Sequence, residues 1–248
     1  MSRIELIEPD WEAPANVVAR VSTRVGGYSE GAKAGLNLAL HVGDDAEQVQ
    51  RNRRLFLQQL DGADQLQWLN QVHGADVARI IHVEDGLSAD AVVTETPGIA
   101  CCVMTADCLP LFLCNKAGTE IAVVHCGWRG MAAGVVAQTI AAMHSPTHEL
   151  MAWMGPAIGV CHFEVGEDVL HAFWGLSDEF LSCFVPAPRP GKYWADLYEI
   201  CRLQLSSKGV GQVSGGGFCT FWDEQRFFSH RRDADSGRIA AAIFLRES

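Results

Sequence analysis

The sequence lacks an excess of positive charge. It contains 19 Lys and Arg residues against 30 Asp and Glu residues, which gives a formal net charge of −11 over 248 residues. Nucleic acids and anionic membrane surfaces are bound through extended positive faces, so this balance argues against both as partners. It leaves open a local arginine pocket for a small anion, and the partner we expect is a small molecule.

The sequence also lacks a long apolar run and a secretory signal. The longest apolar stretch, Ile99 to Cys114, is interrupted by Asp107 and Pro110, so it is not expected to span a membrane. Residues 1–10 lack the basic start and the apolar core of a secretory signal. The nine cysteines form no CxxC pair, and several lie inside apolar runs, which is typical of buried free thiols in a reducing compartment. We therefore expect a cytoplasmic protein.

Composition and pattern predict a folded domain with helices and strands. Hydrophobic residues make up 48% of the chain and charged residues 20%, which argues against disorder. Strands are expected at residues 17–22, 65–71, 77–83, 91–94, 99–105, 109–114, 120–125, 150–154, 160–165 and 239–245. Helices are expected at residues 46–60, 130–143, 168–174, 177–184 and 196–207, the first capped by Asp44 or Asp45. No linker or repeat divides the chain, so we expect one α/β or α+β domain with mixed sheets over residues 1–248.

Three short segments place metal-binding side chains at the ends of strand-like runs. These side chains are His73, Cys108 and His125. Two imidazoles and a thiolate suit zinc or copper, and three protein ligands leave a fourth position open for water or substrate, as in catalytic zinc sites. The ligands are far apart in the sequence and form no local motif such as HExxH, so separate strands must bring them together.

The same residues allow two other interpretations. Cys108 can be a nucleophile with His125 as its base, as in cysteine hydrolases, although this leaves His73 without a role. The cysteines can also be ordinary core residues, because free cysteine is among the most buried residue types. Asp107, a charged residue in an apolar stretch next to Cys108, favours a site at this position. All three interpretations stay open on residue patterns alone.

Glycine and arginine segments suggest places where an anion could bind. Residues 23–27 and 213–220 are glycine-rich turns whose backbone N–H groups can hold an anion. Arginines cluster at residues 231, 232 and 238, and Arg231 or Arg232 is a candidate for bidentate binding of phosphate. The alternative is a solvated loop in which these arginines pair with Asp233 and Asp235. The histidines for which we predict no role are His41, His82, His144, His148, His162 and His171.

These motifs together resemble the YfiH-like family, also called the laccase-domain or multicopper polyphenol oxidoreductase family. The resemblance covers nearly the whole chain, and its most specific parts are Ala-Asp-Cys-x-Pro at 106–110 and His-x-Gly-Trp-Arg-Gly at 125–130. Further matching segments lie at 23–27, 37–38, 41–44, 52–53, 71–74, 89–91, 219–220 and 228–232. The chain departs from the family pattern at Cys126, His230 and Ser236, where alanine, tyrosine and threonine are common. Adjacent strand residues point to opposite faces, so we expect Cys126 to face away from His125.

The resemblance implies a four-layer α/β/β/α sandwich and a single metal centre. His73, Cys108 and His125 correspond to the family's metal ligands, which usually hold one zinc ion with an open fourth position; copper is the alternative. A multicopper oxidase needs several coppers and many more histidine ligands than this chain offers.

The resemblance also implies a function in purine metabolism. The expected reaction is phosphorolysis of adenosine, inosine and methylthioadenosine to base and ribose 1-phosphate, accompanied by adenosine deaminase activity. The alternatives are copper-dependent oxidation of polyphenols and a cysteine- or zinc-dependent hydrolase that edits peptidoglycan precursors. We expect Asp107 to transfer protons, and we expect a monomer or weak oligomer. The residues expected to bind substrate or phosphate are Arg24, Asn37, Gln71, Arg129 and Arg231.

Overall fold

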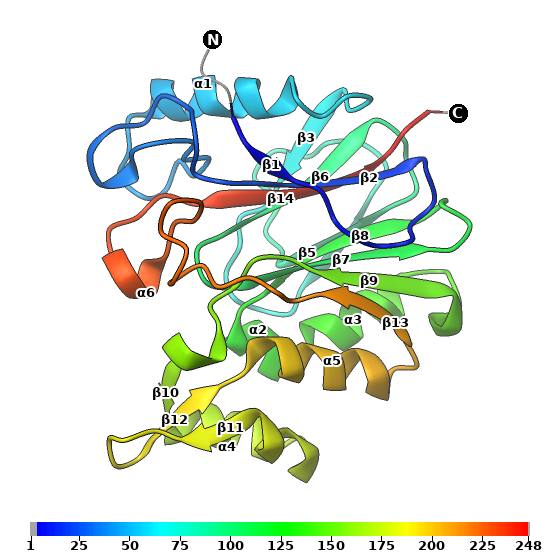
Figure 1. Ribbon diagram of the computed structural model, residues 1–248. Coiled ribbons are helices and arrows are strands. Elements are labelled where there is room, and N and C mark those ends of the chain that lie inside the picture. The colour runs from blue at the N-terminus through cyan, green and yellow to red at the C-terminus, as the bar shows by residue number, and fades with distance from the viewer. Residues whose placement is uncertain (1–3, 248) are drawn as a thin grey trace.

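Two mixed β-sheets lie face to face at the centre of the molecule, in a computed structural model that describes residues 4–247 (Figure 1). The first sheet has the strand order β1 (Leu6–Ile7), β2 (Val17–Ser22), β14 (Ile239–Leu245), β6 (Ile99–Thr105) and β3 (Gln65–Trp68). The second has the order β13 (Gln212–Gly215), β9 (Leu150–Met154), β7 (Leu109–Asn115), β8 (Ile121–Cys126), β5 (Ala91–Thr94) and β4 (Val77–Ile80). Parallel pairs lie at sheet edges, namely β3 with β6, β13 with β9 and β4 with β5, and the other pairs are antiparallel.

Strand β7 shows why both faces of the second sheet are apolar. Leu109, Leu111 and Leu113 contribute to the core beneath the helices, whereas Phe112 and Cys114 contribute to the core between the two sheets. Side chains alternate between faces along a strand, so a strand that is buried on both sides must be apolar throughout. The uninterrupted apolar run in the sequence therefore reflects a central strand of a layered structure.

Helices cover the outer faces of both sheets and complete the four layers (Figure 1). α1 (Ala46–Leu57) packs Leu55 and Phe56 against the outer face of the first sheet, and the side chain of Asp45 caps it by accepting from the N–H groups of Glu47 and Gln48. The second sheet is covered by α2 (Trp128–Ala132), α3 (Val135–Ala142) and α5 (Leu197–Ser207). The predicted α/β/β/α sandwich with mixed sheets is confirmed.

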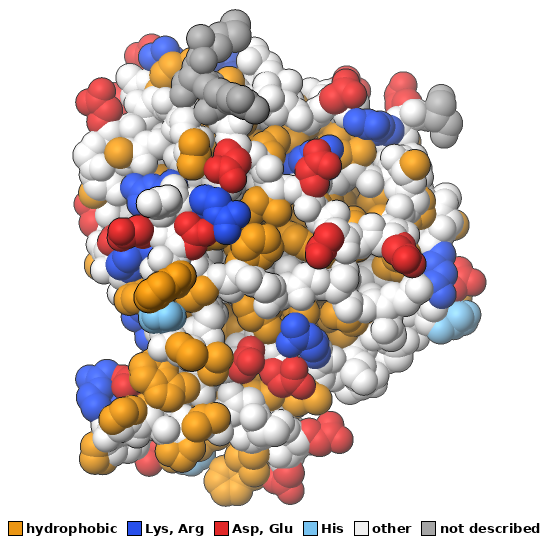
Figure 2. Space-filling view, in the orientation of Figure 1, with side chains coloured by type: hydrophobic (Ala, Val, Ile, Leu, Met, Phe, Trp, Pro, Cys, Tyr) orange, Lys and Arg blue, Asp and Glu red, His pale blue; other side chains and the backbone are white. Residues whose placement is uncertain are grey.

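A small lobe extends the helical layer on the side away from the first sheet (Figure 1). It contains α4 (Glu167–Trp174) and a sheet of β10 (Glu164–Gly166), β12 (Lys192–Ala195) and β11 (Phe184–Pro186). Hydrophobic side chains gather on the surface of this part of the molecule in Figure 2, and Trp174, Leu176 and Val185 are exposed. Among residues 4–247, no helix has both the length and the apolar character needed to cross a bilayer.

Several predicted elements differ from those observed. The helix expected over 130–143 is wrong, because Gly134 adopts a left-handed φ of 92° and separates α2 from α3. The strand expected over 160–165 is a 3-10 helix at Val160–His162 followed by β10, and the helix expected over 177–184 is a 3-10 helix at Asp178–Cys183. Further 3-10 helices lie at Gly31–Lys33 and Thr147–Glu149, and a one-turn helix, α6, at His230–Asp233. The strands at 17–22, 91–94, 99–105, 150–154 and 239–245 have the predicted bounds.

Candidate active site

The structure brings His73, Cys108 and His125 together where the two sheets meet. His73 lies in the loop after β3, Cys108 lies between β6 and β7, and His125 is in β8. Their ligand atoms all lie within 4.8 Å of one another, and the two imidazole rings meet edge to face with centroids 4.8 Å apart. We call these three residues the His–Cys–His cluster. Three sequence-distant residues predicted as ligands thus converge on one point.

The buried carboxylate of Asp90 organises the cluster. It accepts a hydrogen bond from the backbone N–H of Val72, His73 and Gly74, at 3.2, 3.0 and 2.7 Å. It also lies 2.7 Å from Nδ1 of His125, which must donate to it. The contact orients the imidazole of His125 and directs Nε2 towards Cys108 and the space where a metal would bind, as buried carboxylates do for zinc-binding histidines. Burial alone would raise the pKa of Asp90, but the His125 contact and the backbone N–H groups outweigh it and lower that pKa.

Electrostatics within the cluster favour the thiolate form of Cys108. Burial acts to raise the pKa of the thiol, but the neighbouring His125 and His73 outweigh it and lower that pKa to about 6. Burial acts to lower the pKa of His125, but the Cys108 thiolate and Asp90 raise it to about 9. Without a metal, the cluster therefore holds a thiolate beside an imidazolium at pH 7. The thiolate is the form of cysteine that binds metals.

Gly127 keeps space open between the three ligands. A Cβ atom at this position would lie 3.1 Å from Cδ2 of His73 and 3.2 Å from Sγ of Cys108. The backbone itself does not require glycine, because φ at Gly127 is −71°. Glycine is therefore required here because a larger residue would crowd His73 and Cys108. The donor set and the second-shell carboxylate fit a single zinc or copper ion with an open position.

A cavity of about 330 Å³ opens onto the cluster. Its lining residues are His41, Gln71, His73, Met104, Thr105, Ala106, Cys108, His125, His230 and Arg238. This lining contains no carboxylate, although the chain carries a net charge of −11. Burial, together with Arg238 and Arg53, lowers the pKa of His41, so this histidine is neutral at pH 7. We call this space the cluster cavity; apart from the Cys108 thiolate, its polar lining is positive or neutral.

Asp107, the predicted proton-transfer residue, does not line the cluster cavity. Its carboxylate accepts from Oγ1 of Thr220 at 2.6 Å, from Oγ of Ser229 at 3.0 Å and from the backbone N–H of Arg231 at 2.7 Å. Asp107 also has a left-handed φ of 87°, which is unusual for a residue other than glycine. The three hydrogen bonds hold the turn in this conformation and set the position of the adjacent Cys108.

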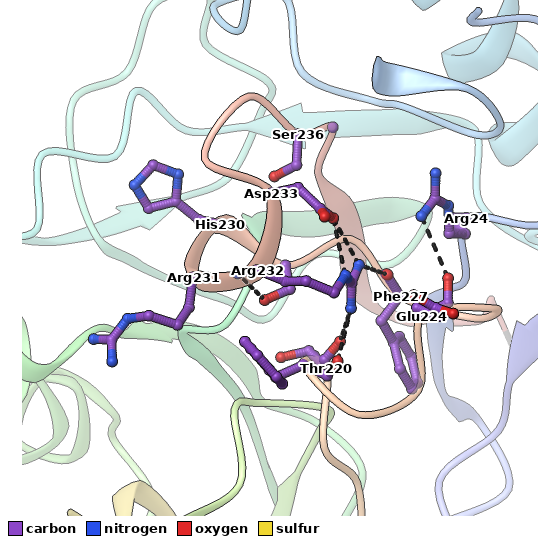
Figure 3. A network of polar contacts seen from close by, with 12 residues as sticks. Arg24, Thr220, Glu224, Phe227, His230, Arg231, Arg232, Asp233 and Ser236 are labelled. Carbon is purple, nitrogen blue, oxygen red and sulfur yellow. Dashed lines mark hydrogen bonds and ion pairs between the residues drawn. The ribbon is translucent and has the colours of Figure 1, made fainter. Parts of the chain in front are cut away.

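The five predicted substrate-binding residues are spread over several environments. Gln71 lines the cluster cavity, but its side-chain amide is already hydrogen-bonded to the backbone of Met104. Its Nε2 donates to the carbonyl oxygen at 2.9 Å, and its Oε1 accepts from the N–H at 2.8 Å. Asn37 is fully buried, and its Oδ1 accepts from the backbone N–H of Arg238 at 2.9 Å. Arg24 lies over the ring of Phe228. Its guanidinium donates to the backbone carbonyl oxygen of Glu224 (Figure 3). Asn37 and Arg24 therefore support the chain around the site from outside the cavity.

The last two predicted phosphate ligands, Arg129 and Arg231, line a separate cavity. Figure 3 shows why neighbouring arginines differ: Arg231 points away from the polar network, whereas Arg232 points into it. Arg232 donates to the carbonyl oxygens of Thr220, Phe221 and Phe227 and pairs with Asp233. Arg232 therefore pairs with Asp233, as the loop interpretation predicted, but its side chain lies mostly inside the molecule and not in solvent.

The prediction that Cys126 faces away from His125 is confirmed. Cys126 is fully buried in the core beneath the helices, next to Cys201 of α5. Sequence patterns did not assign a role to four residues at the site: Asp90, His41, His230 and Arg238. The signals for Asp90 and His41 were their places in the matching segments 89–91 and 41–44, and Arg238 was noted only as part of an arginine cluster.

The fold and the site define a mixed α/β sandwich protein with a His–Cys–His cluster where its sheets meet. The chain belongs to the family described as multi-copper polyphenol oxidoreductase laccase, whose model matches residues 18–246. It is 46% identical over 246 residues to the purine nucleoside phosphorylase PA4543 of Pseudomonas aeruginosa, covering 97% of this chain and 98% of that one. It is 42% identical over 242 residues to the purine nucleoside phosphorylase YfiH of Escherichia coli, covering 97% and 99% of the two chains.

Solved structures have the same fold. The Neisseria meningitidis protein NMB0706 superposes with a TM-score of 0.94 at 46% identity, covering 98% of this chain and 99% of that one. YlmD of Geobacillus stearothermophilus superposes with a TM-score of 0.86 at 32% identity, covering 94% and 93% of the two chains. The resemblance that the sequence motifs indicated is therefore confirmed over nearly the whole chain.

Proposed function

We propose that this protein is a metal-dependent purine nucleoside phosphorylase, which cleaves adenosine, inosine and methylthioadenosine to the base and ribose 1-phosphate. The printed names of relatives that are 42 to 46% identical over nearly the whole chain support a phosphorylase of this kind. The observation that carries the proposal is the cluster cavity, in which Arg238 and three predicted metal ligands meet without any carboxylate in the lining. Such a lining suits a phosphate anion and a polar nucleoside.

His73, Cys108 and His125 would hold one zinc ion, with copper as the alternative. A metal ion bound there would supply Lewis acidity to an oxygen of the substrate or phosphate. Cys108 would contribute a thiolate, and Asp90 would hold His125 with Nε2 directed at the ion. Gly127 would keep the space between the ligands free.

Arg238 is the residue that we assign to phosphate. Its Nη1 donates to the carbonyl oxygens of Ser236 and Gly237 at 2.8 and 2.9 Å, which fixes the guanidinium plane. Its Nε and Nη2 make no hydrogen bond within residues 4–247, so they remain available to a pair of phosphate oxygens. A phosphate held in this way is oriented for attack on C1′ of the nucleoside.

His230 is the residue that we assign to proton transfer. Its Nδ1 lies 2.9 Å from the carbonyl oxygen of Ala234, an acceptor only, so Nδ1 carries a hydrogen and Nε2 is the exchangeable position. As a phosphate oxygen forms its bond to C1′, the C1′–N9 bond breaks and the base takes up negative charge. A proton on Nε2 of His230 would neutralise the leaving base.

Deamination of adenosine in the same cavity is a second proposal. The observation that favours this reaction is that the cluster offers three ligands, so that a metal held by His73, Cys108 and His125 would keep a position for water. The proton carrier would be His41 or His230, both of which line the cavity, because the carboxylate of Asp107 is taken up by three donors elsewhere.

The cysteine hydrolase alternative has a specific observation in its favour. Asp90, His125 and Cys108 are connected in the order carboxylate, imidazole and thiol, which is the arrangement of a nucleophile with an oriented base. It leaves His73 without a role, which is why we place it after the two metal-dependent reactions. Its activity would persist in a chelator and would be lost after alkylation of Cys108. A copper-dependent polyphenol oxidase would instead consume oxygen with phenols.

The phosphorylase proposal is tested by product analysis. Zinc-loaded protein is incubated with inosine in the presence and absence of orthophosphate, and the products are separated by chromatography. We expect hypoxanthine and ribose 1-phosphate only when phosphate is present, and neither from the His73→Ala variant. Release of free ribose without phosphate would identify a hydrolase, and equal activity in His73→Ala would exclude the cluster as the site.

A further inference from the structure

A second cavity lies on the small-lobe side of the molecule. It measures about 640 Å³, against about 330 Å³ for the cluster cavity, and the two share no lining residue. Its walls come from α2, the start of α6 and the small lobe, and they include Trp128, Arg129, Lys192, Trp194, Phe221 and Arg231. We call it the aromatic cavity. Its volume is within the range of small-molecule sites, about 300 to 1,000 Å³.

Three of the four positive side chains in the lining of the aromatic cavity form no ion pair within residues 4–247. These are Arg129, Lys192 and Arg231; Arg189, also in the lining, pairs with Glu164. Asp168 is the other acidic residue of the lining. The lining therefore holds four cationic side chains against two carboxylates, in a chain with a net charge of −11. The concentration of these cations at one cavity indicates an anionic ligand.

The aromatic side chains of the aromatic cavity are held in place by contacts with cations and with one another. The guanidinium of Arg129 lies 4.4 Å from the ring of Trp128, and that of Arg231 lies 5.2 Å from the ring of Phe163. His162 and Phe221 stack with centroids 4.6 Å apart and planes 19° apart. Nη1 of Arg231 is held by the carbonyl oxygen of Glu164 at 2.8 Å, so this cation is positioned before any ligand arrives. Flat surfaces next to fixed cations suit a heteroaromatic ring that carries a phosphate.

We propose that the aromatic cavity binds a nucleoside monophosphate, separately from the cluster cavity. The base would stack on the aromatic walls, and the phosphate would be bound by Lys192 with Arg129 and Arg231. The two cavities are connected through the chain, because the backbone N–H of Arg231 donates to Asp107, the neighbour of Cys108. The proposal concerns binding only, so it stands or falls independently of the phosphorylase activity.

The test measures binding of adenosine 5′-monophosphate to the full chain by isothermal titration calorimetry, with adenosine and orthophosphate as separate probes. We expect the nucleotide to bind more tightly than either probe. Lys192→Gln should weaken its binding by roughly tenfold, as expected for one lost charge-assisted hydrogen bond. Lys192→Glu should weaken it further, and the matched control Lys208→Gln, at an exposed lysine outside the cavity, should leave it unchanged.

A second comparison locates the bound nucleotide. Metal-free His73→Ala protein should bind adenosine 5′-monophosphate as tightly as the unaltered chain, because His73 does not line the aromatic cavity. Loss of binding in His73→Ala with retention in Lys192→Glu would assign the nucleotide to the cluster cavity and overturn the proposal. Absence of binding to the unaltered chain, or orthophosphate binding as tight as that of the nucleotide, would also overturn it.

Discussion

The carboxylate of Asp90 lies 2.7 Å from Nδ1 of His125, and both side chains are almost fully buried. The same carboxylate accepts from the backbone N–H of His73, which has a left-handed φ of 59°. One acidic side chain therefore fixes the orientation of one imidazole and the backbone of the other. Asp90 directly precedes β5, and its side chain holds His73 and His125 in place within the His–Cys–His cluster.

Replacement of Asp90 by asparagine should weaken metal binding without preventing folding. The asparagine side chain would keep the size of the original but would lose the charge that stabilises the His125 orientation. We expect zinc affinity to fall by about 10- to 100-fold, the usual effect of removing a second-shell partner. Competition with a chromophoric chelator measures this affinity. Unchanged affinity would show that the contact with His125 has no role in metal binding.

Zinc affinity should rise with pH over the range in which Cys108 and His125 lose their protons. His125 has a pKa of about 9 without metal, so between pH 6 and 9 the ion must displace its proton. Cys108 has a pKa of about 6, so at lower pH a second proton competes. We expect apparent affinity to increase with pH up to about 9, and more steeply below pH 6. Titration calorimetry in several buffers measures the protons released; a flat profile between pH 6 and 9 would contradict the assignment.

Gly127→Ala should damage the site more than the fold. The added methyl group would meet His73 and Cys108 at 3.1 and 3.2 Å, whereas the backbone conformation suits alanine. We expect weaker zinc binding with a change in unfolding free energy of about 1 kcal/mol or less. Gly211→Ala is the matched control, since nothing lies within 4 Å of the Cβ position there. Equal zinc affinities in the two variants would argue against close packing around the ligands.

Asp107→Asn should affect stability and leave the pH profile of catalysis in place. Its carboxylate accepts from Thr220, Ser229 and Arg231, and asparagine tolerates the left-handed φ. Because the amide replaces a charged acceptor, we expect a loss of about 1 to 3 kcal/mol in unfolding free energy. Denaturant titration and the pH dependence of kcat test this. If the pH profile of kcat for Asp107→Asn lost one of its limbs, Asp107 would be identified as a proton-transfer residue.

Arg238 and Arg24 should differ in their effect on phosphate. Arg238 lines the cluster cavity, whereas Arg24 lies over Phe228 away from it. Arg238→Gln is expected to raise the KM for phosphate by about tenfold or more, through loss of charge-assisted hydrogen bonds. Arg24→Gln should leave that KM within about twofold, since surface substitutions away from a site have small effects. Steady-state kinetics with varied phosphate distinguish the two variants. A larger rise in KM for Arg24→Gln than for Arg238→Gln would identify Arg24 as the phosphate-binding residue.

The three cluster residues could be singled out because each lies at or near an end of a predicted strand and has distinctive neighbours, such as Cys108 before Pro110. The central strands were predictable for a related reason: burial on both faces makes β6 and β14 apolar throughout. Val160–His162 follows a glycine and winds into a 3-10 helix, so the apolar pattern alone misassigned these residues to a strand. Strand β12 has mixed burial, and the sequence pattern predicted no strand there.

The second-shell and cavity residues could not be predicted in the same way. Asp90 acts through backbone N–H groups that only the fold brings within reach. His41 and Arg238 come from opposite ends of the chain and meet because Asn37 holds the backbone of Arg238. Arg129 and Arg231 are close in sequence to site residues, yet their side chains enter the aromatic cavity. Proximity along the chain does not determine the direction in which a side chain points.

Titration of metal-free protein with zinc, with inosine phosphorolysis measured at each step, tests the central claim most directly. If the His–Cys–His cluster is the catalytic metal site, activity should be absent without metal, should rise linearly and should reach its plateau at one equivalent of zinc per chain. Cys108→Ser protein should show no such rise. Full phosphorolysis in the metal-free protein, or a plateau that Cys108→Ser shares, would contradict the account.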